Sequence, residues 1–217
     1  AAARQAAADA MEAIRDSAYD ASTGLAREKG AFPAFDAKAY AGRPFIRGLP
    51  GAIRSAIGST GIRNSHLTAI APTGTISLLA GNVSSGIEPC FGLEAVRHLL
   101  APGGDRRRFE TVSYALAEWR ATHAAGAPPR DCFVDAGGIA PREHLLMQAA
   151  LQPYVDSGIS KTVALPGDAT AADVDALLRE AYELGVKGCT VFRAGARPAM
   201  IEPSNAACAV RGCLPDA

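Results

Sequence analysis

A strand, a helix and a second strand follow one another near the end of the chain, and this order constrains the fold more than any other feature. In Ile159–Leu165 apolar residues alternate with polar or small ones, as in a strand, and Val186–Arg193 is the next strand. Between them, Ala169–Leu184 repeats apolar residues every three or four positions, which predicts a helix with Thr170 as its N-cap. Because such a helix spans the gap between two strands, the pattern predicts a βαβ unit with parallel strands and an α/β fold.

Four further helices are predicted, over residues 1–30, 51–59, 109–124 and 141–157. The first should end at Gly30 and bury a face made of Met11, Ile14, Ala18, Ala21 and Leu25. The last is apolar nearly all round and is expected to be buried. Its polar residues Gln148 and Gln152 would then need hydrogen-bond partners inside the protein.

The composition is that of a globular protein and excludes several functions. Of the 217 residues, 48% are hydrophobic and 20% charged, and 22 basic side chains balance 22 acidic ones. This balance suggests neither a nucleic-acid partner nor an anionic membrane surface. No apolar run reaches the roughly 18 residues of a membrane span, and the N-terminus lacks the apolar core of a signal peptide. Five scattered cysteines suit a reducing cytoplasm better than a disulfide framework.

The segment His66–Asn82 has the pattern of a phosphate-binding turn. It is predicted to form a strand (Leu67–Ala71), a tight turn (Pro72–Thr75) and the start of a helix (Ile76–Leu79). In such a turn the backbone N–H groups stay unpaired, and the positive end of the helix dipole points at the same place. Both features favour an anion.

The side chains of this turn agree with phosphate binding without requiring it. Thr73, Thr75 and Ser77 offer hydroxyl donors, and Gly74 lets the backbone approach an anion without a Cβ in the way. The Lys of a Walker loop and the glycines of a dinucleotide fingerprint are both missing. From the residues alone, two interpretations stay open: a phosphate site and a plain strand-to-helix turn.

A resemblance to a known family favours the phosphate site. The stretch from Arg63 to Pro89, RNSHLTAIAPTGTISLLAGNVSSGIEP, resembles the corresponding stretch of adenosylcobalamin-dependent (class II) ribonucleotide reductases. Similar segments flank it in the same order, and together they cover most of Asp16–Arg193: DSAYDASTGLAREKGAFPAFDAKAY, REHLLMQAALQPYVDSGISKTVALPGD and AYELGVKGCTVFR. The resemblance implies an oxidoreductase that makes deoxyribonucleotides by radical chemistry. It also implies the C-terminal half of the family's ten-stranded α/β barrel.

The resemblance assigns a substrate, a cofactor and a binding site. In the family the PTGTIS turn holds the diphosphate of the ribonucleotide substrate. That role falls here on Pro72, Thr73, Gly74, Thr75, Ile76 and Ser77. Adenosylcobalamin is implied as the cofactor of the complete enzyme, with its main contacts outside this chain.

The family's radical cysteine is absent from the sequence. It lies in an Asn-x-Cys-x-Glu loop in the family, and none of the five cysteines here has that context. No catalytic residue is therefore assigned. We expect residues 1–200 to be the C-terminal portion of the barrel, inactive without a complementary N-terminal half, and residues 201–217 to be a flexible tail.

Three residues are expected near the substrate, each with an alternative. Glu88 would hold a ribose hydroxyl or accept backbone N–H bonds in its loop. Lys161 would reach the substrate phosphate or pair with a carboxylate, Asp156 or Glu183. Cys189 lies in a strand that is near the active site in the family, and its alternative is a buried small hydrophobe.

The remaining cysteines and the histidines give weaker evidence of a functional site. Cys208 and Cys213 resemble loosely the family's mobile C-terminal pair, which re-reduces the active site by thiol exchange. The four histidines, His66, His98, His123 and His144, have no metal-ligand spacing, and no metal site is predicted.

Three functional hypotheses remain at this point. The chain is a subunit or fragment of the reductase, a freestanding nucleotide- or phosphate-binding module without catalysis, or a remnant that keeps the fold alone. A half-barrel leaves sheet edges and apolar faces uncovered. The first hypothesis therefore predicts association with a complementary chain, and the second predicts a self-sufficient monomer or homodimer.

Overall fold

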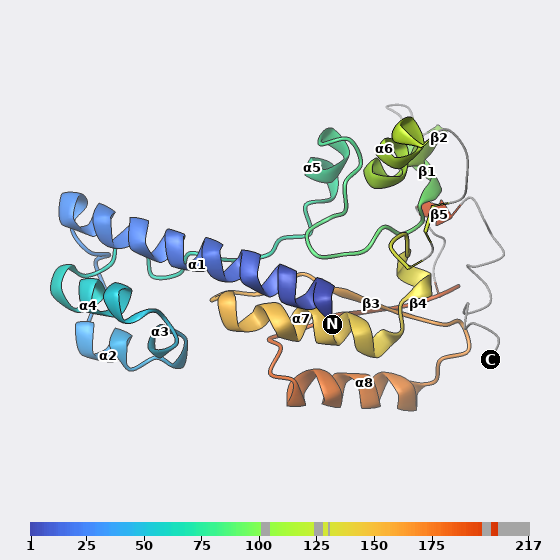
Figure 1. Cartoon of the computed structure of the whole chain (residues 1–217). Helices are drawn as coiled ribbons and strands as arrows, with labels where there is room; N and C mark the ends of the chain where they lie inside the picture. Colours follow the sequence, from blue (N-terminus) through green and yellow to red (C-terminus); the bar gives the residue numbers. More distant parts are fainter. Residues whose placement is uncertain (101–104, 124–127, 130, 197–200, 204–217) are drawn as a thin grey trace. The chain divides into compact units, whose positions relative to one another are not determined.

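The computed structural model describes residues 1–100, 105–123, 128–129, 131–196 and 201–203. These residues form two compact units (Figure 1). The first unit comprises residues 1–70 and 146–159, and the second comprises residues 71–145 and those from 160 onward. The division runs through one helix, α7 (Pro141–Leu151).

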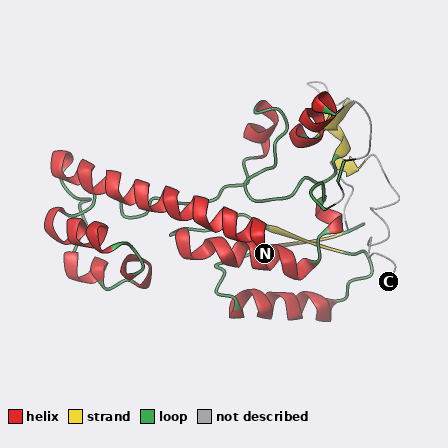
Figure 2. Ribbon diagram, in the orientation of Figure 1, coloured by secondary structure: helices red, strands yellow, loops and turns green. Residues whose placement is uncertain are grey.

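The first unit is helical (Figure 2). Its elements are α1 (Ala2–Lys29), α2 (Ala37–Ala41), α3 (Pro44–Arg47), α4 (Gly51–Thr60), the C-terminal part of α7 and the 3₁₀ helix η2 (Gln152–Tyr154). Helix α1 packs against α4 and η2, and α2 packs against α3 and α4. The core of this unit is formed by Tyr19, Tyr40, Ile46, Leu49, Ile53, Ile57 and Ile62.

Helix α1 ends where the sequence predicts but buries a different face. Gly30 follows its last residue with a φ of 79°, a conformation that favours glycine. The predicted apolar face is wrong, because Ile14 is 56% and Leu25 is 38% exposed. The buried residues are Ala8, Arg15, Tyr19, Ser22, Thr23 and Ala26. Tyr19 decides this orientation, since its ring enters the core and its hydroxyl binds Asp156.

The segment predicted as a strand over residues 67–71 makes a single β-bridge, in which Ile70 pairs with Ile159 in parallel. The prediction of a full strand was wrong: the carbonyl of Thr68 and the N–H of Ile70 bond to the backbone of Ser157 and Gly158, but a side chain takes the donors at the start of the segment. The backbone N–H groups of Leu67 and Thr68 donate to the carboxylate of Asp156, at 2.6 and 3.0 Å. The segment is extended, but it has no described ladder.

The second unit contains two small sheets. One is antiparallel with the order β2–β1–β5, formed by β1 (Glu94–Leu100), β2 (Arg106–Val112) and β5 (Ile201–Pro203). The other pairs β3 (Thr162–Leu165) in parallel with β4 (Thr190–Arg193). The helices of this unit are α5 (Gly74–Leu79), α6 (Tyr114–Thr122), α8 (Ala171–Glu183), the 3₁₀ turn η1 (Ala136–Gly138) and the start of α7.

The predicted βαβ unit is confirmed. Helix α8 connects the parallel strands β3 and β4, and its N-cap Thr170 forms a capping box with Asp173. The core of the unit lies between these elements and α7, and consists of Leu145, Val163, Leu165, Leu177 and Ala181. The described strands do not close into a barrel.

Two predicted helices were too long. Residues 109–112 belong to β2, and α6 begins only at Tyr114, after Ser113 caps it. Helix α7 ends at Leu151, and a 3₁₀ turn containing Pro153 replaces its predicted last turns. A proline in a helix removes one hydrogen bond and clashes with the preceding turn. Residues 201–203, assigned to a tail by the sequence, pair with β1.

Candidate functional site

The turn before α5 has a strained residue at its centre. Thr73 has φ 47° and ψ 29°, in the left-handed region that side chains other than glycine rarely occupy. Its carbonyl accepts from the N–H of Ser77 at 2.8 Å, which is the first bond of the helix. Helix α5 thus begins at Gly74, two residues earlier than the sequence predicts. A strained residue of this kind persists only where its surroundings hold it.

Two hydrogen bonds hold this turn against the loop that follows α5. The Thr73 hydroxyl accepts from the N–H of Gly86 at 2.7 Å. The hydroxyls of Ser77 and Ser85 share a hydrogen bond at 3.1 Å, and Ser77 also donates to the carbonyl of Gly74 at 2.8 Å. Ser77 is 3% exposed. The hydroxyls of Thr73 and Ser77 therefore hold the turn in shape, whereas the sequence suggests them as donors to a ligand.

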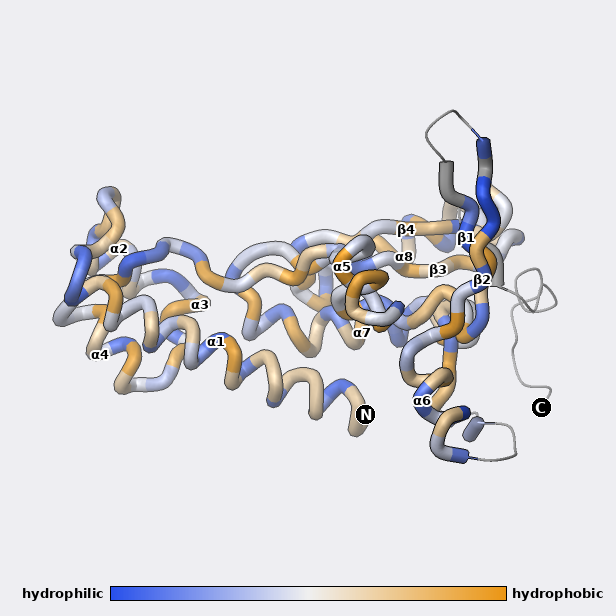
Figure 3. The backbone as a smooth tube through the Cα atoms, turned by 90° about the horizontal axis from the view of Figure 1, so that it is seen from above, coloured by the Kyte–Doolittle hydropathy of each residue, from blue (hydrophilic) through white to orange (hydrophobic). Residues whose placement is uncertain are grey.

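The start of α5 leaves backbone donors without acceptors in the helix. Gly74, Thr75 and Ile76 are its first three residues, whose N–H groups precede the first intrahelical bond. No side chain caps them. All three residues are exposed. Helix α5 is largely apolar, and its side chains Ile76 and Leu79 are 66% and 89% exposed (Figure 3). The arrangement suits an anion at the helix start.

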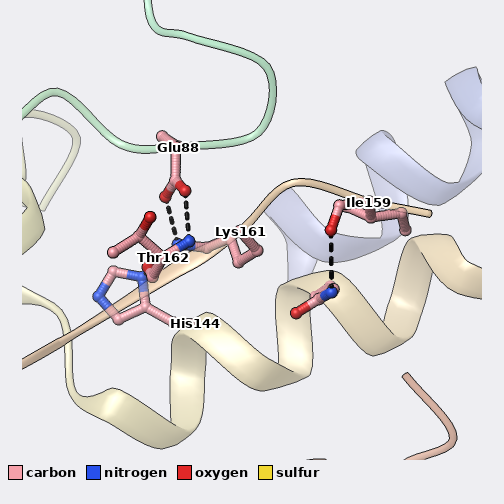
Figure 4. A network of polar contacts seen from close by, with 6 residues as sticks. Glu88, His144, Ile159, Lys161 and Thr162 are labelled. Atoms are coloured by element: carbon pink, nitrogen blue, oxygen red, sulfur yellow. Dashed lines mark hydrogen bonds and ion pairs between the residues drawn. The ribbon is translucent and has the colours of Figure 1, made fainter. Parts of the chain in front are cut away.

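Glu88 and Lys161 lie together in the same unit, next to this loop (Figure 4). One oxygen of Glu88, Oε2, lies 2.5 Å from Lys161 Nζ. The other oxygen, Oε1, accepts from the backbone N–H of Thr162 in β3. The sequence considers Asp156 and Glu183 as partners of Lys161, and the structure instead pairs it with Glu88.

The ammonium group of Lys161 is saturated. Besides Glu88, it donates to the carbonyl of Thr162 at 2.6 Å and to Nδ1 of His144 at 2.9 Å. An ammonium has three N–H donors, and three acceptors take them here. The side chain is 1% exposed. Burial lowers the pKa of Lys161, and the hydrogen bond and charge of Glu88 oppose that effect.

His144 completes this cluster. It is 2% exposed and lies on α7. Because Nδ1 accepts from Lys161, a neutral ring carries its proton on Nε2. Burial lowers the pKa of His144, and the nearby Lys161 charge lowers it further.

His144 was missed by sequence reasoning, although a signal was present. It precedes Gln148 by four residues, so the two polar residues share one face of a helix whose remaining residues after Glu143 are apolar. Both glutamines find partners as expected. Gln152 donates to the carbonyls of Val155 and Ser157, and Gln148 donates to that of Ile159.

The cysteines are less informative. Cys189 packs against the core of the second unit, and burial raises the pKa of its thiol. A thiol in this state is a poor nucleophile. Cys208 and Cys213 lie outside the described residues. Within the described ranges, no three His, Cys, Asp or Glu side chains gather in a way that holds a metal ion, and no helix there is long and apolar enough to cross a membrane.

Comparison with known proteins identifies the family. The family model described as "Ribonucleotide reductase, barrel domain" matches residues 1–192. The chain belongs to the ribonucleotide reductase barrel-domain family. The resemblance found in the sequence is confirmed.

Relatives of this reductase domain are named as B12-dependent enzymes. The "Vitamin B12-dependent ribonucleoside-diphosphate reductase" of Mycobacterium tuberculosis (strain CDC 1551 / Oshkosh) is 39% identical over 212 residues, covering 90% of this chain and 28% of that protein. The protein of the same name from Thermoplasma acidophilum is 37% identical over 199 residues, covering 84% of this chain and 24% of the relative. The chain thus spans about a quarter of the length of these relatives.

A solved structure shares the fold of this reductase domain. The "Actinobacillus ureae class Id ribonucleotide reductase alpha subunit" superposes with a TM-score of 0.58 at 20% sequence identity. The match covers 89% of this chain and 35% of that one. It supports the α/β barrel class for the chain, of which the described strands are a part.

The names of the relatives imply adenosylcobalamin for the full reductase. An open hollow on the second unit is lined by apolar residues of α7, β3 and α8 together with the charged residues Arg142, Asp168, Asp173 and Glu180. A large cofactor ring needs a deeper and more apolar enclosure. We therefore assign no described residue to the cofactor.

Proposed function

We propose that this chain is part of a vitamin B12-dependent ribonucleotide reductase and contributes the turn that binds the substrate diphosphate. The observation that carries the proposal is the uncapped start of α5, whose turn is held in a strained shape by the following loop. This turn lies in a chain of the ribonucleotide reductase barrel family. The complete enzyme converts ribonucleotides to 2′-deoxyribonucleotides.

The backbone N–H groups of Gly74, Thr75 and Ile76 are the ligands in this proposal. They point along the helix axis toward its N-terminus, where the helix dipole adds positive potential. Thr75 is exposed and adds a hydroxyl. Thr73 and Ser77 shape the turn through their bonds to Gly86, Ser85 and Gly74. The donors are thus fixed before the diphosphate arrives, which lowers the entropic cost of binding.

The chemistry of reduction belongs to a complementary N-terminal half in this proposal. The sequence holds no Asn-x-Cys-x-Glu loop, so the cysteine that attacks the ribose must come from elsewhere. This chain then binds and orients the substrate without turning it over alone. The complementary half and the ribonucleotide are its two partners.

A single exposed position tests the binding turn. Thr75→Glu places a carboxylate where the phosphate binds, while an acidic residue in the first turn stabilises the helix. Calorimetric titration with a ribonucleoside diphosphate should show binding to the unmodified chain and at least tenfold weaker binding to Thr75→Glu. Thr75→Gln has the shape of the Glu variant without its charge, and it should weaken binding far less than Thr75→Glu does. The bare nucleoside should bind far more weakly than the diphosphate.

Leu79→Glu is the matched control, because it adds the same charge at the other end of α5, at a residue that is 89% exposed. It should weaken the affinity for the diphosphate less than Thr75→Glu does, because the added charge lies one helical turn beyond Thr75 and farther from the N–H groups of the first turn. Equal affinity of Thr75→Glu and the unmodified chain would exclude the turn as the diphosphate site.

A further inference from the structure

The Glu88–Lys161 pair is built as an anchor. A charged Lys is almost never fully buried unless it is paired, and Lys161 is 1% exposed. All three of its donors are taken by Glu88, His144 and Thr162. It has no N–H left for a substrate phosphate. Its charge instead holds Glu88.

Glu88 fastens its loop to a strand. One carboxylate oxygen binds Lys161, and the other binds the backbone N–H of Thr162. Thr162 begins β3, and the carbonyl of Lys161, the residue before it, accepts from the N–H of Thr190 in β4. Both oxygens of Glu88 are therefore directed at the start of β3 (Figure 4). The side chain of Glu88 thus attaches this loop to β3 of the βαβ unit.

The same loop holds the turn before α5. The N–H of Glu88 donates to the carbonyl of Ser85 at 2.8 Å, which closes a tight turn over residues 85–88. From this turn, Gly86 donates to Thr73 and Ser85 binds Ser77. A continuous series of hydrogen bonds thus runs from Lys161 to the strained Thr73.

We infer that Glu88 and Lys161 are positioning residues for the diphosphate-binding turn: their ion pair fixes the 85–88 loop, which in turn holds Thr73 and Ser77. This inference rests on the proposed function. Neither residue touches the substrate. The pair acts by keeping the N–H groups of Gly74, Thr75 and Ile76 aimed at one place.

The test uses the full chain and two variants of the anchor, Glu88→Gln and Lys161→Met. Amide hydrogen exchange is measured at Gly86 and Thr162, together with the affinity for a ribonucleoside diphosphate. We expect Glu88→Gln to speed exchange at Gly86 at least tenfold and to weaken diphosphate binding at least tenfold. Lys161→Met should do the same. Unchanged exchange at Gly86 in both variants would overturn the inference.

Matched controls come from an exposed ion pair in the same unit. Arg179 and Asp175 of α8 pair at 2.7 Å with side chains that are 74% and 62% exposed. Arg179→Met and Asp175→Asn should change neither exchange at Gly86 nor diphosphate affinity. Circular dichroism shows whether each anchor variant folds. If a single variant does not fold, the double variant Lys161→Met/Glu88→Gln is measured in its place, because it leaves no buried charge unpaired.

A second background separates positioning from direct contact and from general loss of stability. Thr73→Val removes the acceptor of the Gly86 N–H, so the Glu88–Lys161 pair can no longer act on the turn through that hydrogen bond. Glu88→Gln should then weaken binding by less than about threefold further. If Lys161→Met weakens binding equally with and without Thr73→Val, Lys161 does not act through the Thr73 bond and the inference is wrong.

Failure of the proposed function gives a different result. An unmodified chain that is folded and binds no diphosphate contradicts the binding turn. Exchange at Gly86 does not depend on a ligand, so the anchoring of the loop is decided by the exchange rates in either case.

Discussion

Glu88 Oε2 lies 2.5 Å from Lys161 Nζ, although the two residues are 73 positions apart in the sequence. The same carboxylate binds the backbone of β3, so a loop and a strand that are distant in the chain meet at one buried charge. A buried charge is strongly destabilising when its partner is removed. This contact therefore bears on stability as well as on the proposed binding turn.

Removing one member of the pair should destabilise the second unit. Lys161→Met leaves Glu88, whose side chain is 21% exposed, without its cation, and we expect a loss of ~3 kcal/mol in the free energy of unfolding. Urea denaturation followed by circular dichroism measures it. The double variant Lys161→Met/Glu88→Gln should lose less than the sum of the two single variants. Strict additivity would mean that the two side chains do not interact.

Tyr19→Phe should weaken the first unit. The Tyr19 hydroxyl donates to Asp156 at 2.7 Å, and burial together with this bond raises the pKa of Tyr19. Losing the bond should cost about 1–2 kcal/mol in urea denaturation. Tyr182→Phe is the control, because Tyr182 is 85% exposed, and it should change stability by less than about 0.5 kcal/mol.

Gly61→Ala should be strongly destabilising. Gly61 has φ +76°, and an added Cβ would lie 2.7 Å from the Cβ of Ala31 and 3.3 Å from the ring of Phe35. Backbone strain and overlap together should cost about 2–4 kcal/mol. Gly24→Ala in α1 meets nothing within 4 Å and should instead stabilise by about 0.5–1 kcal/mol. Thermal unfolding of the two variants should therefore shift in opposite directions.

Stability should fall in mild acid because of His144. Burial and the charge of Lys161 lower the pKa of His144 below 6.5 in the folded state, while the unfolded chain keeps the ordinary value. Below pH 6.5 the unfolded state thus binds a proton that the folded state does not, and protonation favours unfolding. The contribution is fully present above that pH and is lost as the pH falls toward the folded pKa.

The measurement is urea denaturation between about pH 5 and 8, comparing the unmodified chain with His144→Gln. Each pH unit within the window should cost at most about 1.4 kcal/mol, and the variant should lack this slope. Lys161 and Glu88 are the charged groups that face the ring, and both are unchanged in the variant. If the free energy of unfolding depends on pH equally in both proteins, a titrating group other than His144 is responsible.

Local signals in the sequence predicted much of the fold. Gly30 ends α1 and Thr170 starts α8 where expected, because both act on backbone groups within a few residues. The βαβ unit followed from the apolar spacing of Ala169–Leu184 between two strands. The family followed from ordered motifs that cover most of the chain, and the family model confirms it.

Signals also existed for features that sequence reasoning missed. Pro153 was available to end α7 early, and His144 shares a face of α7 with the buried Gln148. The antiparallel pairing of β1 with β2, which begins with Arg106–Arg108, was not predicted.

The sequence by itself determined the approximate bounds of α1, α4 and α8, the parallel βαβ unit and the family of the chain. The tertiary structure alone decided which face of α1 is buried, that Asp156 takes the place of a strand beside Leu67 and Thr68, and that Glu88 pairs with Lys161. The physical reason is that a helix cap or a hydrophobic period acts over a few residues. A hydrogen bond across tens of residues depends on which segments become neighbours after the chain has folded.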